Sequence, residues 1–270
     1  MTIADLDPSR FLARLHARRL GRNFMYRPSC ASTNDEVAAC ALAGCAEGLL
    51  IVAGEQTGGR GRRGRAWHSP ADENLYFSLL LRPALPAHLA SPVTLLAGAA
   101  LAGALAHLAF APQLKWPNDV LLDTPLGPRK VAGILTEMAS EAGRVRHIVL
   151  GVGINVNTEE FPGHLATLAT SLGLVRGQRV DRGEVVAAFI DAFESIYDDF
   201  VAHGPAAALA EWHRFAKLGK VGWVDRDGGQ REGIAEGVDA SGALLVKIAS
   251  GDVVFLHAGE VNWLPIPFIG

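Results

Sequence analysis

The sequence predicts an α+β fold in which a mixed β-sheet packs on helices and a small β-barrel follows at the C-terminus. Three observations favour this fold. Between residues 114 and 152, apolar segments of strand length follow one another without an intervening helix, which is typical of a mixed or antiparallel sheet. Helical patterns return over 182–202 and 205–215. From Lys217, short strands alternate with turns, as in a small barrel.

The N-terminal elements are expected to be short. Apolar residues at helical spacing after Pro8 predict an amphipathic helix, and residues 24–26 predict a strand. Thr33 and Glu36 have the spacing of a capping box, in which the hydroxyl and the carboxylate satisfy free backbone amides. A second helix is therefore expected from Thr33 to about Ala43.

The central segments predict buried strands and one apolar helix. Residues 49–53 and 75–81 are apolar runs of strand length. Residues 93–111 approach the ~20 apolar residues that span a bilayer. Most of them are Ala and Gly, which contribute little transfer energy, so we expect a buried core helix. Shorter strands are expected over 114–116, 120–122, 131–138 and 146–152.

Length and composition favour two compact domains without a broad cationic surface. A chain of 270 residues suits one large domain over 1–216 and a smaller one over 217–270. Hydrophobic residues make up 49% and charged residues 20%, which excludes a disordered chain. The formal net charge of −3 argues against nucleic acid or an anionic membrane as a partner.

Cysteine usage and the N-terminus favour a cytoplasmic location. Cys30, Cys40 and Cys45 are odd in number, form no C-x-x-C pair and have no His at zinc-ligand spacing. They are expected to be buried thiols in a reducing compartment. The N-terminus lacks the charged start, apolar run and cleavage site of a secretory signal.

A Gly/Arg loop, residues 58–65, is the strongest local signal. It places four arginines within six residues, between glycines that let backbone amides approach an anion. Gly59, Gly61 and Gly64 match G-x-G-x-x-G, but a strand rather than a helix follows, which excludes a dinucleotide fold. The alternative is a solvated surface loop. Because four like charges repel one another unless an anion binds, we predict an anion-binding loop.

Two lysines flank a predicted turn. The chain has five lysines against twenty arginines, and none precedes Lys115, so Lys115 and Lys130 stand out. Residues 116–119 are Trp, Pro, Asn and Asp, which also fit a plain turn. Residues 151–157 close a strand with glycines and amides, which fits either a bulge or close approach to a ligand.

Five segments occur together and in order: Ser32-Thr33-Asn34, Glu55-Gln56-Thr57 before the Gly/Arg loop and Trp67, KWPNDV, RKVAGILTE, and GVGINVN. This combination resembles the biotin protein ligases, also called biotin–acetyl-CoA-carboxylase ligases. The resemblance covers about residues 28–263 and implies a catalytic domain over 1–216, with biotin over the sheet beneath the Gly/Arg loop. It includes Gly237-Val238-Asp239 and Gly259-Glu260-Val261 in the barrel, but Asn262-Trp263-Leu264 departs from the family's small polar and basic residues.

The resemblance also implies the reaction. Biotin and ATP would form biotinyl-5'-AMP with release of pyrophosphate, and Mg²⁺ would screen the polyphosphate. A lysine of a biotin carboxyl carrier domain would then accept biotin, and AMP would leave. Only about thirty residues precede the first motif, so we expect a ligase that lacks the DNA-binding domain and repressor function of some relatives. A monomer or a homodimer, with no nucleic-acid or membrane partner, is expected.

Site residues follow from the same resemblance. Biotin contacts are implied for Ser32, Thr33, Asn34, Gln56, Gly59, Arg60, Gly61, Arg62, Lys130 and Gly133. Nucleotide contacts are implied for Arg60, Arg62, Arg63, Arg65, Trp67, Lys130 and Asn155. We expect Arg62 and Lys130 to be catalytic, because cations lower the barrier when two anions are brought together. Asp119, or Asn118, is a candidate metal ligand, and the Gly/Arg loop is expected to order when ligand binds.

Two other functions remain open at this point. Lipoyl and octanoyl ligases or transferases have a similar catalytic domain, although they give no reason for the Gly/Arg loop. A nucleic-acid-binding module could use Arg60 to Arg65 on a phosphate backbone and would bind in a salt-sensitive way.

Overall fold

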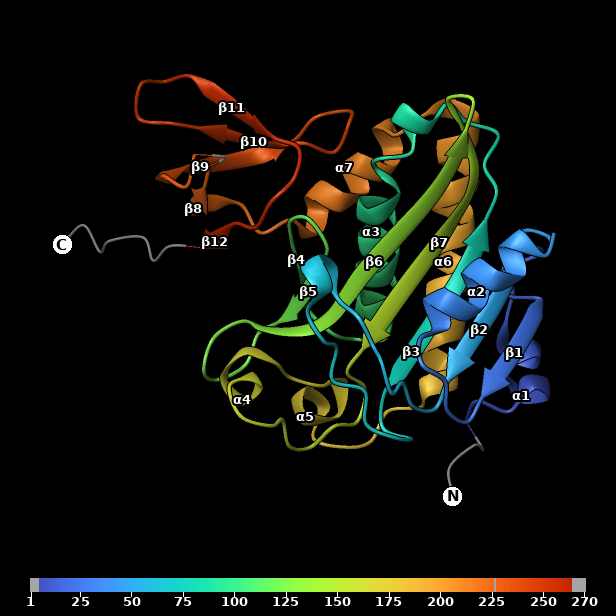
Figure 1. Ribbon diagram of the computed structural model, residues 1–270. Helices are drawn as coiled ribbons and strands as arrows, with labels where there is room; N and C mark the ends of the chain where they lie inside the picture. The colour runs from blue at the N-terminus through green and yellow to red at the C-terminus, as the bar shows by residue number, and fades with distance from the viewer. Residues whose placement is uncertain (1–4, 226, 264–270) are drawn as a thin grey trace.

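The computed structural model describes residues 5–225 and 227–263, which form two β-sheets with helices around the larger one (Figure 1). The strands of the large sheet are β1 (Asn23–Arg27), β2 (Leu49–Ala53), β3 (Leu75–Leu81), β4 (Pro112–Lys115), β5 (Asp119–Leu122), β6 (Arg129–Glu141) and β7 (Arg144–Ile154). They lie in the order β1-β2-β3-β7-β6-β5-β4, with β1 and β2 parallel and the other pairs antiparallel. This mixed sheet confirms the expected α+β fold.

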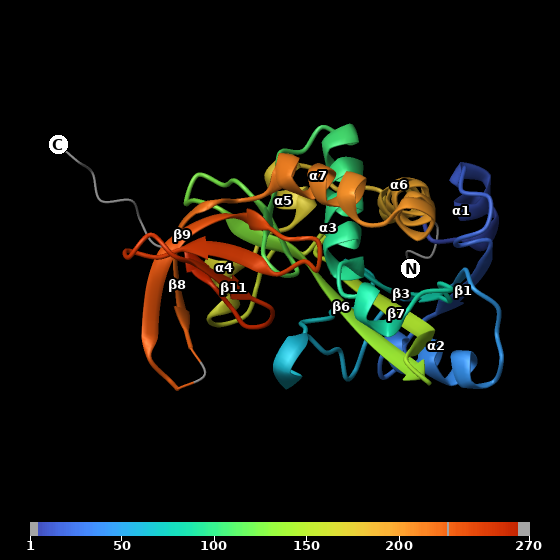
Figure 2. The same ribbon diagram turned by 90° about the horizontal axis from the view of Figure 1, so that it is seen from above.

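Helices cover both faces of the large sheet. The longer ones are α1 (Pro8–Arg14), α2 (Thr33–Leu42), α3 (Val93–His107), α6 (Arg182–His203) and α7 (Ala206–Phe215). Seen from above, α3, α6 and α7 lie on one face, and α2 lies on the other (Figure 2). Two short helices that sequence periodicity did not predict, α4 (Leu165–Leu168) and α5 (Leu172–Arg176), follow β7.

The apolar helix α3 is the core of the helical layer. The segment Ala87–His107 is long and apolar enough to cross a membrane by length and composition alone, and 72% of its most apolar window is buried inside the protein. Its buried side chains form one cluster with those of the sheet and α6. The prediction of a buried core helix is confirmed.

Helix α2 begins differently from the prediction. Its N-cap is Ser32, whose side chain makes no capping hydrogen bond, and Thr33 is the first helical residue. The Thr33 hydroxyl turns to Gln56, and the Glu36 carboxylate lies 2.9 Å from the Arg27 guanidinium of β1. The capping-box interpretation of Thr33 and Glu36 was therefore wrong, because partners from other elements use both side chains.

The C-terminal module is a separate antiparallel sheet. Its strands are β8 (Gly219–Val224), β9 (Gln230–Val238), β10 (Leu244–Lys247), β11 (Val253–Leu256) and β12 (Asn262–Trp263). Their order is β11-β10-β9-β8-β12, and the edge strands β11 and β12 do not pair within residues 227–263. The sheet is therefore open where a closed barrel was expected.

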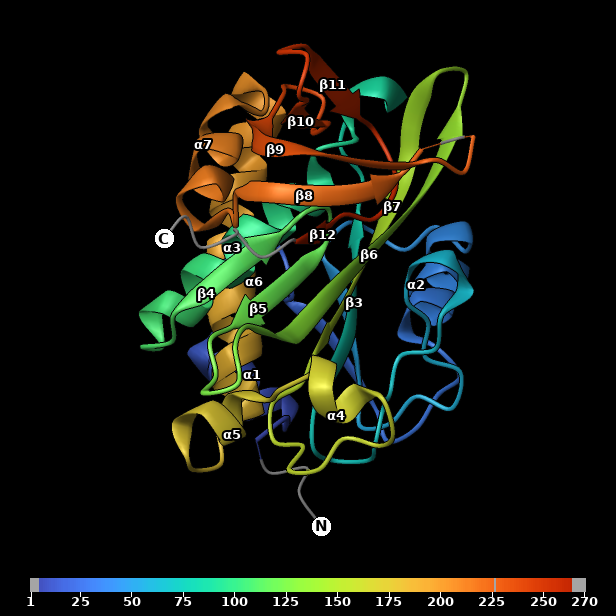
Figure 3. The same cartoon turned by 90° about the vertical axis from the view of Figure 1, so that its left-hand side faces the viewer.

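The small sheet lies against the β4–β5 end of the large one (Figure 3). The Trp116 indole Nε1 donates to the Gly242 carbonyl at 3.0 Å across this contact. Gly242 has a φ of +82°, and a Cβ there would lie 3.1 Å from Leu95, so the turn requires glycine. The expected boundary near residue 217 lies between α7 and β8, whereas residues 1–4 and 264–270, including Leu264, lie outside the described residues.

Candidate active site

Cross-strand register gathers site residues in two rows on the α2 face of the large sheet. The first row is Ser78, Gly151 and Leu135, on β3, β7 and β6. The second row is Tyr76, Gly153, Gly133, Asp119 and Lys115, on β3, β7, β6, β5 and β4. Directly paired residues share a face, so each row forms one continuous strip. Glycine at three of these positions leaves room for groups that lie flat on the sheet.

The first row supports Asn34 of α2. A Cβ on Gly151 would lie only 2.1 Å from Asn34 Oδ1, so the amide rests directly on the strand. Asn34 Nδ2 donates to Glu137 Oε2 at 2.6 Å, and Oδ1 accepts from the Ser78 hydroxyl at 2.6 Å. These two bonds fix the orientation of the amide.

Thr33 and Gln56 extend this network. The Thr33 backbone N–H donates to Gln56 Oε1 at 2.9 Å, and the Thr33 hydroxyl lies 3.2 Å from the same oxygen. The Ser78 hydroxyl lies 2.8 Å from that of Thr33. Ser32, Thr33 and Asn34 are all buried. The network therefore forms a buried polar wall at the start of α2.

The second row supports Trp67. A Cβ on Gly153 would lie 2.6 Å from the indole, and one on Gly133 would lie 3.0 Å from it. The indole therefore lies flat across β6 and β7. Its Nε1 is buried and has no hydrogen-bond partner among residues 5–225 and 227–263.

A β-bulge directs Lys130 to the same face. Val120 and Leu121 are adjacent on β5, but their partners on β6, Ala132 and Lys130, are two residues apart. The residue of β6 between these partners is therefore extra, as in a β-bulge. Without this extra residue, Lys130 and Gly133 would point to opposite faces, because their separation is odd. Lys130 Nζ lies 2.6 Å from Asp119 Oδ1 and 5.1 Å from the centre of the Trp67 ring.

Arg62 is the arginine of the Gly/Arg loop that turns toward the second row. Its Nη1 lies 3.3 Å from Asn118 Oδ1 and 3.4 Å from the Gly259 carbonyl, and no carboxylate pairs with it in the described part of the chain. Burial, and then the charge of Arg63, lower the pKa of this half-buried guanidinium. Arg62 also lines a cavity of about 200 Å³ between the two sheets, with Asn118 and Trp116.

The other loop arginines are paired with carboxylates outside the two rows or are exposed. Arg60 makes two hydrogen bonds to Asp35, at 2.7 and 2.5 Å, and its guanidinium lowers the pKa of that carboxyl. Arg65 forms an ion pair with Glu260 of the small sheet. Arg63 is exposed with a φ of +58°. Asp35 and Glu260 relieve the repulsion among the arginines without an added anion, which the charges of residues 58–65 alone did not predict.

Three further predicted residues have clear structural roles. Gly59 faces Gln56, because a Cβ there would lie 3.1 Å from Gln56 Nε2. The Gly61 N–H donates to the Arg65 carbonyl at 2.7 Å and closes the loop. The buried Asn155 Nδ2 donates to the Thr170 carbonyl at 3.1 Å, which ties the end of β7 to the segment before α5.

The residue-level prediction missed Ser78 and Glu137 and assigned no role to Lys115. Ser78 is the one polar side chain in the apolar run LYFSLLL that becomes β3, which was a detectable signal. Glu137 gives no such signal, because exposed carboxylates are common on strands at the surface.

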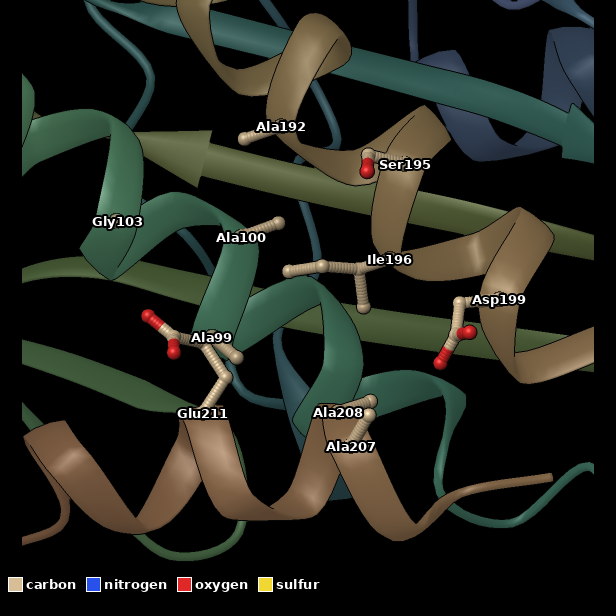
Figure 4. A pocket seen from close by; sticks show the side chains of 10 residues that line it. All are labelled: Ala99, Ala100, Gly103, Ala192, Ser195, Ile196, Asp199, Ala207, Ala208 and Glu211. Carbon is tan, nitrogen blue, oxygen red and sulfur yellow. The ribbon is translucent and has the colours of Figure 1, made fainter. Parts of the chain in front are cut away.

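A larger cavity lies on the opposite face of the sheet, between α3, α6 and α7 (Figure 4). It measures about 300 Å³ and is lined mainly by small residues. Its two carboxylates, Asp199 and Glu211, are paired with His203 and Arg214. It contains none of the residues predicted for the site.

The chain is similar to known proteins in sequence and in fold. Residues 28–155 match the model of the biotin/lipoate A/B protein ligase family. The chain is 36% identical over 236 residues to the bifunctional ligase/repressor BirA of Bacillus spizizenii, covering 86% of this chain and 71% of that protein. It is 35% identical over 238 residues to the biotin–[acetyl-CoA-carboxylase] ligase of Paracoccus denitrificans, and the match covers 85% of this chain and 96% of that protein. Among solved structures, the Aquifex aeolicus biotin protein ligase in complex with biotin and ATP matches with a TM-score of 0.74 and 27% identity. The match covers 89% of this chain and 98% of that chain.

Proposed function

This chain belongs to the biotin protein ligases of the biotin/lipoate A/B protein ligase family, and we propose that it activates biotin with ATP and transfers it to a lysine of a biotin carboxyl carrier protein. The choice of biotin rests on the polar wall formed by the buried Thr33, Asn34 and Ser78 and the half-buried Gln56. Biotin's ureido head offers both donors and acceptors to such a wall. The dithiolane of lipoate and the methyl end of octanoate offer no such donors and acceptors, so they would gain no hydrogen bond from this wall.

The first step joins two anions. The biotin carboxylate attacks the α-phosphorus of ATP, the bond to the bridging oxygen breaks, and pyrophosphate leaves with the bonding electron pair. We propose that Lys130 and Arg62 lie at this centre and offset the charge that gathers there. Their convergence on Asp119 and Asn118 supports this assignment.

The second step needs no covalent enzyme intermediate. The acceptor amine attacks the carbonyl carbon of biotinyl-5'-AMP, an amide forms, a proton leaves the amine, and AMP departs. Cys30, the thiol nearest the Gln56 segment, is not suited to act as a nucleophile, because burial raises its pKa to about 11.

We further propose that Mg²⁺ accompanies ATP and that Asp119 is its protein ligand. Mg²⁺ in nucleotide sites takes one or two carboxylates, with phosphate oxygens and water for the rest. One Asp119 oxygen contacts Lys130, and the other makes no hydrogen bond in the described part of the chain, so the residue fits this role.

The remaining assignments are proposals as well. The free thiols fit a cytoplasmic location, which fractionation of cells would test. The net charge of −3 favours a ligase that does not repress transcription, and a gel-shift assay with promoter DNA fragments, with and without biotin and ATP, would test this. A monomer or a homodimer is expected, and sedimentation at several protein concentrations would decide between them.

The function is tested by pyrophosphate release from purified protein with ATP and Mg²⁺. Biotin, lipoate and octanoate are compared as acids, each at several concentrations. Release with biotin alone is expected. Release with lipoate or octanoate would move the chain to the sister activity, and silence with all three, together with salt-sensitive nucleic-acid binding, would favour a binding module.

A further inference from the structure

Lys115 is the remaining charged residue of the second row, and the proposed mechanism gives it no part. It lies on the edge strand β4, directly opposite Asp119. The side chain is half-buried and makes no hydrogen bond or ion pair within residues 5–225 and 227–263. A half-buried ammonium without a partner costs folding free energy, so its presence calls for an explanation.

The charges around Lys115 do not balance. Lys130, Arg62 and Lys115 are three cations near one carboxylate, Asp119, and that carboxylate pairs with Lys130. Arg65 is already paired with Glu260. Burial lowers the pKa of Lys115, Asp119 opposes this, and the charges of Lys130, Arg65 and Lys217 lower it further. The site thus has excess positive charge at the β4 end of the row.

Lys115 also lies in line with the other nucleotide residues. Along the row, Trp67 covers Gly133 and Gly153, Lys130 and Asp119 come next, and Lys115 is last. Neighbouring strands are about 4.8 Å apart, so the Lys115 backbone lies roughly 10 Å from Gly133. A phosphate chain that begins near Lys130 and extends away from Trp67 would therefore approach the Lys115 ammonium.

We propose that Lys115 binds the β- and γ-phosphates of ATP and stabilises the pyrophosphate that leaves, which rests on the proposed adenylation of biotin. When the bond between the α-phosphorus and the bridging oxygen breaks, the electron pair stays on that oxygen. Lys115 offsets the added negative charge and donates a hydrogen bond to it. No proton is transferred. Lys115 therefore acts in the first step and has no part in the transfer of biotin from biotinyl-5'-AMP.

The two steps are measured separately for Lys115→Gln, Lys115→Arg and the wild type. Biotin-dependent pyrophosphate release reports the first step, and transfer from added biotinyl-5'-AMP to a carrier domain reports the second. Lys115→Gln should lower kcat/KM for ATP by about tenfold or more, weaken product inhibition by pyrophosphate about as much, and change transfer by less than about twofold. Lys115→Arg should recover part of the first step. Lys247→Gln is the control, because Lys247 is exposed on β10 of the small sheet.

The outcomes separate this inference from the function itself. If the wild type forms biotinyl-5'-AMP but Lys115→Gln keeps normal kinetics for ATP and pyrophosphate, the assignment of Lys115 is overturned. Slower transfer with normal adenylation would also overturn it, and would indicate instead that Lys115 contacts the acceptor protein. If the wild type forms no biotinyl-5'-AMP, the proposed function fails, whatever Lys115 does.

Discussion

At the scale of single residues, the site depends on which cations already have partners. Arg60 and Arg65 are neutralised by Asp35 and Glu260, so they position the Gly/Arg loop. Among the described residues, the partners of Arg62 are neutral and lie at 3.3 and 3.4 Å, so the hydrogen bonds are weak and its charge is available to an anion. Four arginines that look equivalent in the sequence therefore have different roles.

Lys130 is expected to affect both chemical steps. Its ammonium would lie at the biotin carboxyl group, which reacts first with ATP and then with the acceptor amine. Lys130→Gln should slow pyrophosphate release by about a hundredfold, the effect of losing one transition-state donor, and should also slow transfer. Rapid-quench measurement of each step checks this. Normal adenylation in the variant would remove Lys130 from the mechanism.

The unpaired Lys115 should cost stability. Its folded-state pKa is lowered, so below that pKa both states are protonated and the destabilisation is fully present. As pH rises from the folded towards the unfolded pKa, the folded state loses its proton first and stability increases. Lys115→Met should therefore raise the Tm at pH 7 by about 2 °C or more, with a smaller gain near pH 10. Calorimetry across this range checks the sign, and a lower Tm at pH 7 would contradict it.

At the scale of elements, β6 and β7 form the floor on which both substrates are expected to lie. Glycines at 133, 151 and 153 remove side chains from this floor, and they bring Asn34 and Trp67 into direct contact with the strands. The bulge in the β5–β6 pairing then turns Lys130 towards the same floor. The β6–β7 hairpin thus positions Asn34 of α2, Trp67 from the segment after the Gly/Arg loop, and Lys130 of β6 itself.

Two substitutions on β7 should each raise the KM for a different substrate. Gly151→Ala displaces Asn34 and should raise KM for biotin, whereas Gly153→Ala displaces Trp67 and should raise KM for ATP. Each increase should be about tenfold or more, because a displacement near 1 Å is costly in a preorganised site. Steady-state kinetics with each substrate varied in turn checks this.

Gly103→Ala is the matched control for these two variants. A Cβ on Gly103 meets nothing within 4 Å, and alanine favours the helix, so activity should be normal and Tm equal or higher. Equal effects of Gly151→Ala and Gly153→Ala on both KM values would show that the two rows do not serve different substrates.

At the scale of the whole molecule, the C-terminal module reaches the site through the turn between β9 and β10 and through the segment that precedes β12. The Trp116 indole donates to the Gly242 carbonyl beside the N-terminus of α3. Arg62 and Arg65 of the Gly/Arg loop contact Gly259 and Glu260. The position of the small sheet and the position of the catalytic loop are therefore coupled.

Trp116→Phe should weaken the contact between the small sheet and the large domain. The ring is largely retained, but the Gly242 carbonyl loses its donor, so the free energy of unfolding should fall by about 1–3 kcal/mol. KM for ATP should rise as the contacts of Arg62 loosen. Trp263→Phe is the control, since the buried Trp263 Nε1 has no partner among the described residues. Denaturant unfolding and ATP kinetics of both variants test the coupling, and equal losses in both would contradict it.

The sequence by itself determined the α+β class, the order and approximate bounds of most helices and strands, and the segments that meet at the site. These follow from apolar periodicity, turn residues and an ordered set of motifs, all of which are local. It did not determine how polar side chains would pair. Thr33 and Glu36 fit a local cap and instead bind Gln56 and Arg27, and Arg60 and Arg65 find carboxylates in α2 and in the small sheet.

Only the tertiary structure decided that Lys130 faces the site and that Lys115 has no partner in the part of the chain that the structure describes. The face of Lys130 depends on one extra residue in the pairing of β6 with β5, and hydrophobic alternation along β6 alone does not specify it. The isolation of Lys115 depends on Asp119 being taken by Lys130, from another strand. Both outcomes depend on competition among charged groups far apart in the chain, which is resolved only when the strands are in register.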